Sequence, residues 1–175
     1  MNPAEEIVKF WLQQNGYFYQ SSIRVESIKG NPSSRNKEID ILAIHKDGKI
    51  KRHIEVSVSI KSVLTRTTLD EAKKKSAKFN HPAVKAETAK IFGDGVEYEK
   101  EFVVGNIGKG KAKEYIEKMK DLFDIKVTPM SEVLESIAPK LHAHHQLNPI
   151  LQTLRIGKEF SDQLKDPSTH TSSHG

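Results

Sequence analysis

Two carboxylates lie inside apolar stretches of neighbouring segments, and they are the first sign of chemistry in this sequence. Asp40 interrupts an apolar run that continues to residue 44, and Glu55 is flanked by Ile54 and Val56. A carboxylate in the middle of an apolar strand is costly unless a bound cation or solvent compensates its charge. Carboxylate oxygens suit Mg²⁺ or Mn²⁺. The pattern indicates a hard-cation site, and the alternative is a solvated sheet face that carries ordinary surface acids.

The turn between these two segments predicts that the carboxylates approach each other. Asp47-Gly48 is a strong hairpin signal, so the expected strands 38–44 and 50–59 pair antiparallel. Asp40 and Glu55 are only fifteen positions apart through this short turn and can therefore lie close together on one sheet. The metal hypothesis requires that no permanent basic side chain fills the space between them.

The remaining pattern predicts a single α/β domain over residues 1–165. Helical periodicity or capping signals indicate helices at about 3–14, 68–79, 83–91, 111–123, 131–142 and 148–164, and strands are expected at 17–25, 38–44, 50–59, 98–107 and 125–127. Tight turns predict antiparallel pairing of the first three strands, and the later strand–helix–strand order predicts parallel pairing. The expected fold is a three-layer core with a mixed sheet flanked by helices, with extra C-terminal helices and a disordered tail at 166–175.

Composition favours a polyanionic partner. Lys and Arg number 28 against 23 Asp and Glu, and the net charge is +5. We expect phosphate contacts from clustered lysines, with a solvated helix face as the alternative; the candidates are Lys73, Lys74, Lys78 and Lys109. No apolar run is long enough for a membrane span, no secretory signal is visible and there is no cysteine, so a cytoplasmic protein is the simplest expectation.

The order of these pieces resembles the PD-(D/E)xK (restriction-endonuclease-like) nuclease superfamily, especially its branched-DNA resolvase-like and type IV restriction-like members. Such proteins have an acid in the first helix, a Gly-aromatic pair at the first strand, an Ile-Asp-hydrophobic strand and a Glu-x-Lys strand. The matching pieces here are Ala4-Glu5, Gly16-Tyr17, Ile39-Asp40-Ile41 and Glu55-Val56-Ser57. The resemblance covers residues 3 to 60, and the order of helices and strands fits to about residue 128.

The resemblance implies a metal-dependent nuclease that hydrolyses DNA phosphodiester bonds, with DNA expected rather than RNA and a homodimer as a possible assembly. Asp40 and Glu55 would bind the Mg²⁺ or Mn²⁺, and the carbonyl of Val56 would complete the shell. Glu5 would act through water or orient a lysine, although Asn2-x-x-Glu5 is also the spacing of a helix cap. The metal would lower the pKa of a bound water and stabilise charge on the phosphate.

The sequence departs from the family pattern at Ser57, which stands where the family has lysine. One interpretation is that another lysine supplies the charge, either Lys61 on the same strand face or Lys73 or Lys74 on the next helix. A second is a site that works without lysine. A third is a catalytically inactive protein of this fold that binds nucleic acid or acts as an interaction or oligomerisation subunit.

Three other features carry less weight. His53 shares the strand face of Glu55 and could contact a phosphate or water, although a lone strand histidine is more often structural. The histidines at 142–145 match no zinc spacing. The glycine-rich segment 105–110 lacks the P-loop pattern, although its amides and Lys109 could touch a phosphate.

Overall fold

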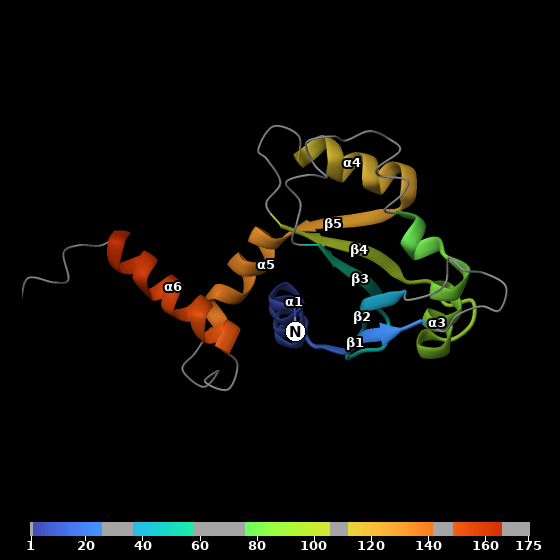
Figure 1. Ribbon diagram of the computed structural model, residues 1–175, viewed down its shortest axis with the longest axis horizontal. Coiled ribbons are helices and arrows are strands. Elements are labelled where there is room, and N and C mark those ends of the chain that lie inside the picture. The colour runs from blue at the N-terminus through green and yellow to red at the C-terminus, as the bar shows by residue number, and fades with distance from the viewer. Residues whose placement is uncertain (1, 26–36, 58–75, 106–111, 142–148, 166–175) are drawn as a thin grey trace, which may run out of the picture.

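The protein is organised around a five-stranded mixed sheet (Figure 1). The computed structural model describes residues 2–25, 37–57, 76–105, 112–141 and 149–165. The strands are β1 (Tyr17–Arg24), β2 (Glu38–His45), β3 (Lys51–Ser57), β4 (Glu99–Val104) and β5 (Ile125–Pro129), and they lie in that order across the sheet. The first three strands pair antiparallel, whereas β3, β4 and β5 pair parallel. The expected mixed α/β sheet is confirmed.

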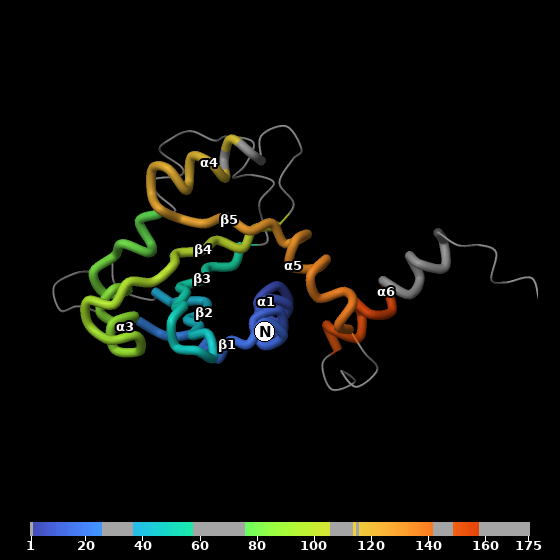
Figure 2. Tube along the Cα trace, turned by 180° about the vertical axis from the view of Figure 1, so that it is seen from behind, coloured from blue at the N-terminus to red at the C-terminus, as the bar shows by residue number. Residues whose placement is uncertain are grey.

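Helices cover both faces of this sheet, which gives three layers (Figure 2). Helices α1 (Pro3–Gln14) and α5 (Met130–Ile137) pack on one face, and α6 (Pro149–Lys165) packs against them. Helices α3 (Pro82–Phe92) and α4 (Ala112–Phe123) and the helical residues 76–80 cover the other face. The central strand β3 is therefore enclosed on both sides. No helix in the described ranges is both long and apolar enough to cross a membrane.

Local signals explain where these elements begin and end. Asn2 caps α1 through its side chain, which accepts a hydrogen bond from the Ala4 N–H, and Pro3 occupies the first helical position. The β2–β3 turn uses Gly48 in the left-handed conformation, with φ at 73°, as the Asp-Gly signal predicts.

One helix ends earlier than its periodicity predicts. The expected helix over 131–142 ends at Ile137 and continues only as the 3₁₀ turn Ala138–Lys140. Pro139 explains this difference, because proline has no N–H to donate and its ring collides with the preceding turn of an α-helix. The expected helix over 68–79 is described only from residue 76, and the expected tail at 166–175 lies outside the described residues.

Candidate active site

The β2–β3 hairpin brings Asp40 to the point where its two strands separate. The pairing of β2 with β3 ends at Ile41 opposite Ile54. One step further would place Asp40 opposite Glu55, but the Asp40 carboxylate instead accepts a 2.7 Å hydrogen bond at Oδ2 from the backbone N–H of Val56. A side chain thus replaces a ladder hydrogen bond, which fixes the carboxylate and leaves its Oδ1 for another partner.

Glu55 is hydrogen-bonded to a histidine on its own strand. Its side chain is only 2% exposed, because β3 is the central strand and is covered by helices. His53 is fully buried two residues earlier on the same face, and its Nε2 shares a 2.8 Å hydrogen bond with Glu55 Oε1. The His53 ring packs edge-on against Phe79, with 4.6 Å between the ring centres. Glu55 therefore has a fixed orientation.

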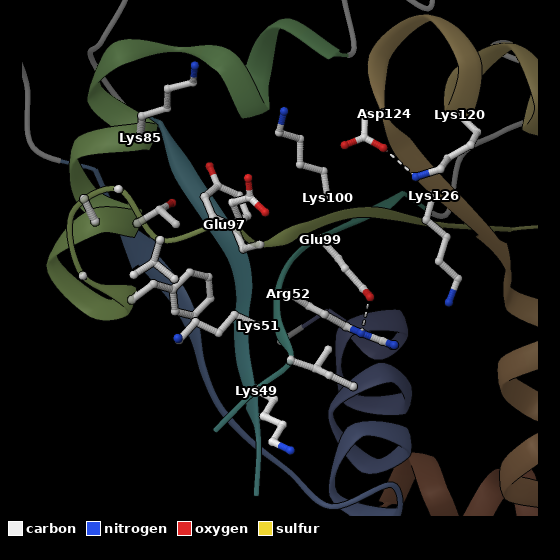
Figure 3. Close-up of a pocket in the computed structure, with 18 residues that line it drawn as sticks. Lys49, Lys51, Arg52, Lys85, Glu97, Glu99, Lys100, Lys120, Asp124 and Lys126 are labelled. Carbon is white, nitrogen blue, oxygen red and sulfur yellow. Dashed lines mark hydrogen bonds and ion pairs between the residues drawn. The ribbon is translucent and has the colours of Figure 1, made fainter. Parts of the chain in front are cut away.

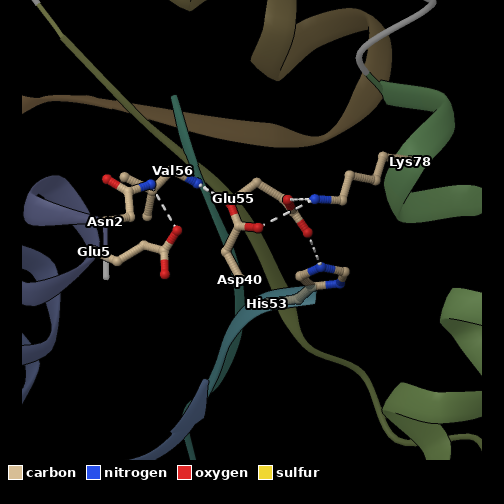
Figure 4. A network of polar contacts seen from close by, with 7 residues as sticks. All are labelled: Asn2, Glu5, Asp40, His53, Glu55, Val56 and Lys78. Carbon is tan, nitrogen blue, oxygen red and sulfur yellow. Dashed lines mark hydrogen bonds and ion pairs between the residues drawn. The ribbon is translucent and has the colours of Figure 1, made fainter. Parts of the chain in front are cut away.

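Lys78 lies between the two carboxylates. It comes from the helical residues 76–80, and its ammonium contacts Glu55 Oε2 and lies 3.3 Å from Asp40 Oδ1 (Figure 4). The side chain of Lys78 is 33% exposed, so it reaches the site from the solvent side. We name Asp40, Glu55, Lys78 and His53 the carboxylate cluster. Its two acids converge on one position, and that position holds a positive charge.

Burial and mutual charge set the protonation of the cluster. Burial, and then the negative charge of Asp40, raises the pKa of Glu55 to about 8 although Lys78 opposes the shift. Burial alone would lower the pKa of Lys78, but Glu55 and Asp40 outweigh it and the pKa is raised. Burial, followed by the charges of Lys78 and Lys100, lowers the pKa of His53 to about 3. Near neutral pH, Lys78 is therefore charged and His53 is neutral, and burial favours the protonated form of Glu55 more than that of an exposed glutamate.

Glu5 lies beside the cluster on α1, on the side away from Lys78 (Figure 4). Its Oε1 accepts a 2.7 Å hydrogen bond from the Nδ2 of Asn2, the residue that caps the same helix. Within the described ranges Glu5 is bonded to Asn2 and not to Asp40 or Glu55. The helix-cap interpretation of Glu5 therefore accounts for its position.

Of the other predicted residues, Ser57 lies within the described residues and four lysines lie outside them. Ser57 ends β3, two residues beyond Glu55, and its carbonyl accepts a hydrogen bond from the Gly105 N–H. The lysines that were expected to replace the missing family lysine or to bind phosphate lie outside the described residues, and these are Lys61, Lys73, Lys74 and Lys109.

The structure gives Lys78 and His53 partners that the sequence does not predict. The sequence groups Lys78 with lysines that contact phosphate, and in the structure its ammonium is directed at two carboxylates inside the cluster. Phe79 is the single large apolar residue in the run 73–80, and it is fully buried. It therefore marks the side of the helix that faces the core, and Lys78 is its neighbour in the sequence. The sequence allows His53 to contact a phosphate or a water. In the structure His53 is fully buried and is hydrogen-bonded to Glu55.

The two carboxylates of the cluster are of the donor type that a divalent cation prefers, but Lys78 occupies the space that the metal hypothesis requires to be free of a permanent basic side chain. Across the described residues, no three His, Asp or Glu side chains are grouped as a ready metal shell. The cluster does offer two carboxylates whose oxygens, Asp40 Oδ1 and Glu55 Oε2, already meet at one cationic atom. Mg²⁺ is usually held by one or two carboxylates and completes its shell with water and substrate oxygens. A divalent cation there would also relieve the electrostatic cost that raises the pKa of Glu55.

Comparisons with known families, with curated proteins and with solved structures find no significant match to this chain. Its function therefore has to be argued from the geometry of the cluster and from the charges around it.

Proposed function

We propose that this protein is a divalent-metal-dependent nuclease that hydrolyses DNA phosphodiester bonds. The single observation that carries the proposal is the convergence of the Asp40 and Glu55 carboxylates on one cationic position, at the end of the paired part of a central hairpin. The PD-(D/E)xK resemblance supplies the choice of reaction. The antiparallel β1–β2–β3 unit, the parallel β4 and the three layers are compatible with that fold, which we propose as the fold of this domain.

Asp40 and Glu55 would hold Mg²⁺ or Mn²⁺ through their oxygens. Bound there, the metal would lower the pKa of a water ligand and stabilise negative charge on the phosphate. The Val56 N–H keeps Asp40 in position, and His53 keeps Glu55 in position, so neither carboxylate has to be ordered when substrate arrives. Because Glu55 has a raised pKa, its proton must leave for it to act as a ligand, and metal binding should strengthen as pH rises.

Lys78 supplies the positive charge that Ser57 lacks. Its side chain is long, partly exposed and anchored on a different element from the carboxylates. Like-charge repulsion from a divalent cation would move its ammonium out of the gap and toward solvent, where a phosphate would lie. A lysine at that place attracts the phosphate and orients a nucleophilic water, which is the role that the resemblance assigns to the lysine of the Glu-x-Lys strand.

A second candidate function follows from the same residue. Lys78 already neutralises the two acids, as a permanent basic partner would. If its ammonium stays between them in the presence of metal, the protein would bind nucleic acid through its basic surface without cutting it. Breaking a buried ion pair by removing one partner is costly, so a purely structural cluster would also explain why the three charges lie together.

A nicking assay with a matched pair of variants tests the proposal. Supercoiled DNA is incubated with the protein and either Mn²⁺, Mg²⁺ or EDTA. We expect metal-dependent nicking that falls at least about 100-fold in Asp40→Asn, because one metal oxygen is lost while the amide oxygen can still accept from Val56. Glu38→Gln, an exposed carboxylate on the same strand, should nick like the wild type. Equal background in all three proteins would reject the nuclease and leave the second candidate, which DNA binding without metal would then support.

A further inference from the structure

A second feature of the molecule lies apart from the carboxylate cluster. A cavity of about 1020 Å³ opens at the amino ends of β3 and β4, between the β2–β3 turn, α3 and the end of α4 (Figure 3). Asp40, Glu55 and Lys78 do not line it. Arg52 in its lining is three residues from Glu55 along β3, or roughly 10 Å at the rise of a strand. Tyr98 in its lining lies near the cluster residue His53, with 6.2 Å between the ring centres.

The lining of this cavity has a strong excess of positive charge. Seven of its residues are Lys or Arg and three are Asp or Glu, an excess of four. Such a local excess attracts anions and repels cations, and the walls of a concavity intensify the field. The cavity therefore selects a ligand that carries several negative charges.

Ion pairs account for part of this charge. Arg52 Nε lies 2.9 Å from Glu99, and its guanidinium also reaches the buried Glu101 at 3.4 Å. Lys120 pairs with Asp124 across the end of α4. These two cations are held by neighbouring acids and form a fixed wall on one side of the cavity.

Lys126 lies 3.4 Å from Glu101, and the lysines that remain in the lining are available to a ligand. Lys49, Lys51 and Lys85 form no ion pair with any residue that the structure describes. They come from the β2–β3 turn, from β3 and from α3, so they surround the cavity and do not line one helix face. Lys100 adds a fourth charge from β4, and its ammonium lies 3.4 Å from the neutral side chain of Asn80. Figure 3 shows the lysines directed along the rim from different elements.

Between the lysines, the cavity has an apolar and aromatic wall. Tyr98 is half-buried and packs against Phe92, with 5.6 Å between the ring centres. Ile50 and Val96 extend this wall, and Ile50 is one of the few exposed large hydrophobic residues in the described ranges. Surfaces that combine cations with aromatic and apolar groups bind unpaired bases and their phosphates together.

We infer that this cavity binds an unpaired strand of nucleic acid, with its phosphates on Lys49, Lys51, Lys85 and Lys100 and its bases against Tyr98 and Ile50. A duplex would bring phosphates but keep its bases stacked inside, so it would leave the apolar wall unused. The choice of a nucleic acid strand rests on the proposed nuclease function, and the inference deepens it by naming single-stranded regions as the substrate class.

Binding of a fluorescein-labelled twelve-nucleotide thymidine strand, followed by anisotropy in EDTA, tests this inference without any metal chemistry. The triple variant Lys49→Gln/Lys51→Gln/Lys85→Gln should bind at least about 10-fold more weakly, and its salt slope should fall by about 2, since each single-strand phosphate contact contributes ~0.7. The matched control Lys90→Gln/Lys118→Gln/Lys140→Gln removes the same charge from residues that do not line the cavity, and it should bind within about 2-fold of the wild type.

Equal weakening in both triple variants, or no binding of the strand by the wild type, would overturn the inference. A duplex of the same length that binds as tightly as the strand would also overturn it. So would full displacement of the strand by ATP at concentrations near those of the strand. These outcomes are distinct from failure of the proposed function. Strand binding that depends on the three lysines without nicking would remove the nuclease and keep the cavity. Nicking with unchanged strand binding in the triple variant would remove only the cavity.

Discussion

The carboxylate cluster and the lysine-lined cavity are neighbours on β3, but they handle charge in opposite ways. In the cluster, two acids and one lysine lie within direct contact and are largely enclosed, so each charge depends on the others. In the cavity, seven cations face three acids and several lysines are exposed. Buried charge must be matched because desolvation is costly, whereas surface charge can remain in surplus because water screens it.

The carboxylate cluster and the cavity are suited to different tasks. A matched, enclosed cluster has strongly shifted pKa values and fixed geometry, which suits proton and metal chemistry. An unmatched, open surface supplies attraction at small structural cost, which suits binding of a polyanion. Parallel variants in the two regions should therefore behave differently in stability and pH dependence.

The largest expected difference is in the pH dependence of stability. In the unfolded chain the pKa of Glu55 is near 4.5, and in the folded protein burial and Asp40 raise it to about 8. Between these values Glu55 keeps a proton that the unfolded chain has lost, so its contribution to the free energy of unfolding falls as pH rises. Below pH 6.5 His53 acts in the opposite sense, because burial lowers its pKa from 6.5 to about 3, so the net fall is expected mainly between pH 6.5 and 8. At ~1.4 kcal/mol per pKa unit, the full shift corresponds to a contribution of at most about 5 kcal/mol from Glu55.

Urea unfolding at several pH values between 4.5 and 8.5 measures this contribution. Glu55→Gln cannot titrate and should lose most of the downward slope. Glu97→Gln, which removes an exposed carboxylate from the cavity, should keep the slope of the wild type. If the curves of Glu55→Gln and the wild type run parallel, Glu55 is not the buried, protonated acid that we describe.

The next effect concerns two lysines in different settings. Lys78→Met leaves Asp40 and Glu55 without their cation and should lower the free energy of unfolding by about 2 kcal/mol, a value reduced by the partial exposure of Lys78. Lys85→Met removes an exposed lysine from the cavity and should change stability by less than about 0.5 kcal/mol.

Manganese then separates the two proposed roles of the cluster. If Asp40 and Glu55 hold a metal, Mn²⁺ should restore the stability of Lys78→Met and raise its thermal midpoint more than that of the wild type, because no ammonium competes. Nicking by this variant should fall about 10- to 100-fold, since the charge near the phosphate is gone. A thermal midpoint that Mn²⁺ leaves unchanged in both proteins would show that the cluster is structural.

How far the sequence predicts the cluster depends on the kind of contact. The approach of Asp40 to Glu55 follows from local signals, since the Asp47-Gly48 turn sets the register of two adjacent strands. The place of Lys78 does not follow in this way. It depends on the orientation of a helix relative to the sheet, and a run with four lysines between 73 and 78 does not reveal which of them turns inward.

His53 and the cavity show two further limits. The alternation in β3 places His53 on the face of Glu55, but its full burial depends on Phe79, a residue distant in the chain. The cavity joins lysines from a turn, a helix and two strands, and sequence spacing carries no record of that convergence. The antiparallel pairing of the first three strands and the parallel pairing of the later ones, by contrast, follow from turn lengths and connections, and the structure shows both.

The smallest expected effect concerns the backbone of the two regions. Beside the cluster, Ser22 has a φ of 54° and lies between the β1–β2 pairs Ser21–Ile41 and Ile23–Ile39, opposite Asp40. Around the cavity, this left-handed conformation falls on glycines such as Gly95, with φ at 70°, and on Asp124. Serine pays a steric cost at such a position that glycine does not, and Asp tolerates it better than most residues.

Opposite substitutions should therefore have opposite signs. Ser22→Gly should raise the free energy of unfolding by about 0.5–1 kcal/mol, because relief of the strain exceeds the extra entropy of glycine in the unfolded chain. Gly95→Ser should lower it by about 1 kcal/mol, and since a Cβ there meets nothing within 4 Å, the backbone alone is responsible. Ser21→Gly, at a normal strand position, should be destabilising. If Ser22→Gly is as destabilising as Ser21→Gly, then β1 carries no strain next to Asp40, and the rigidity of the cluster comes from its side chains alone.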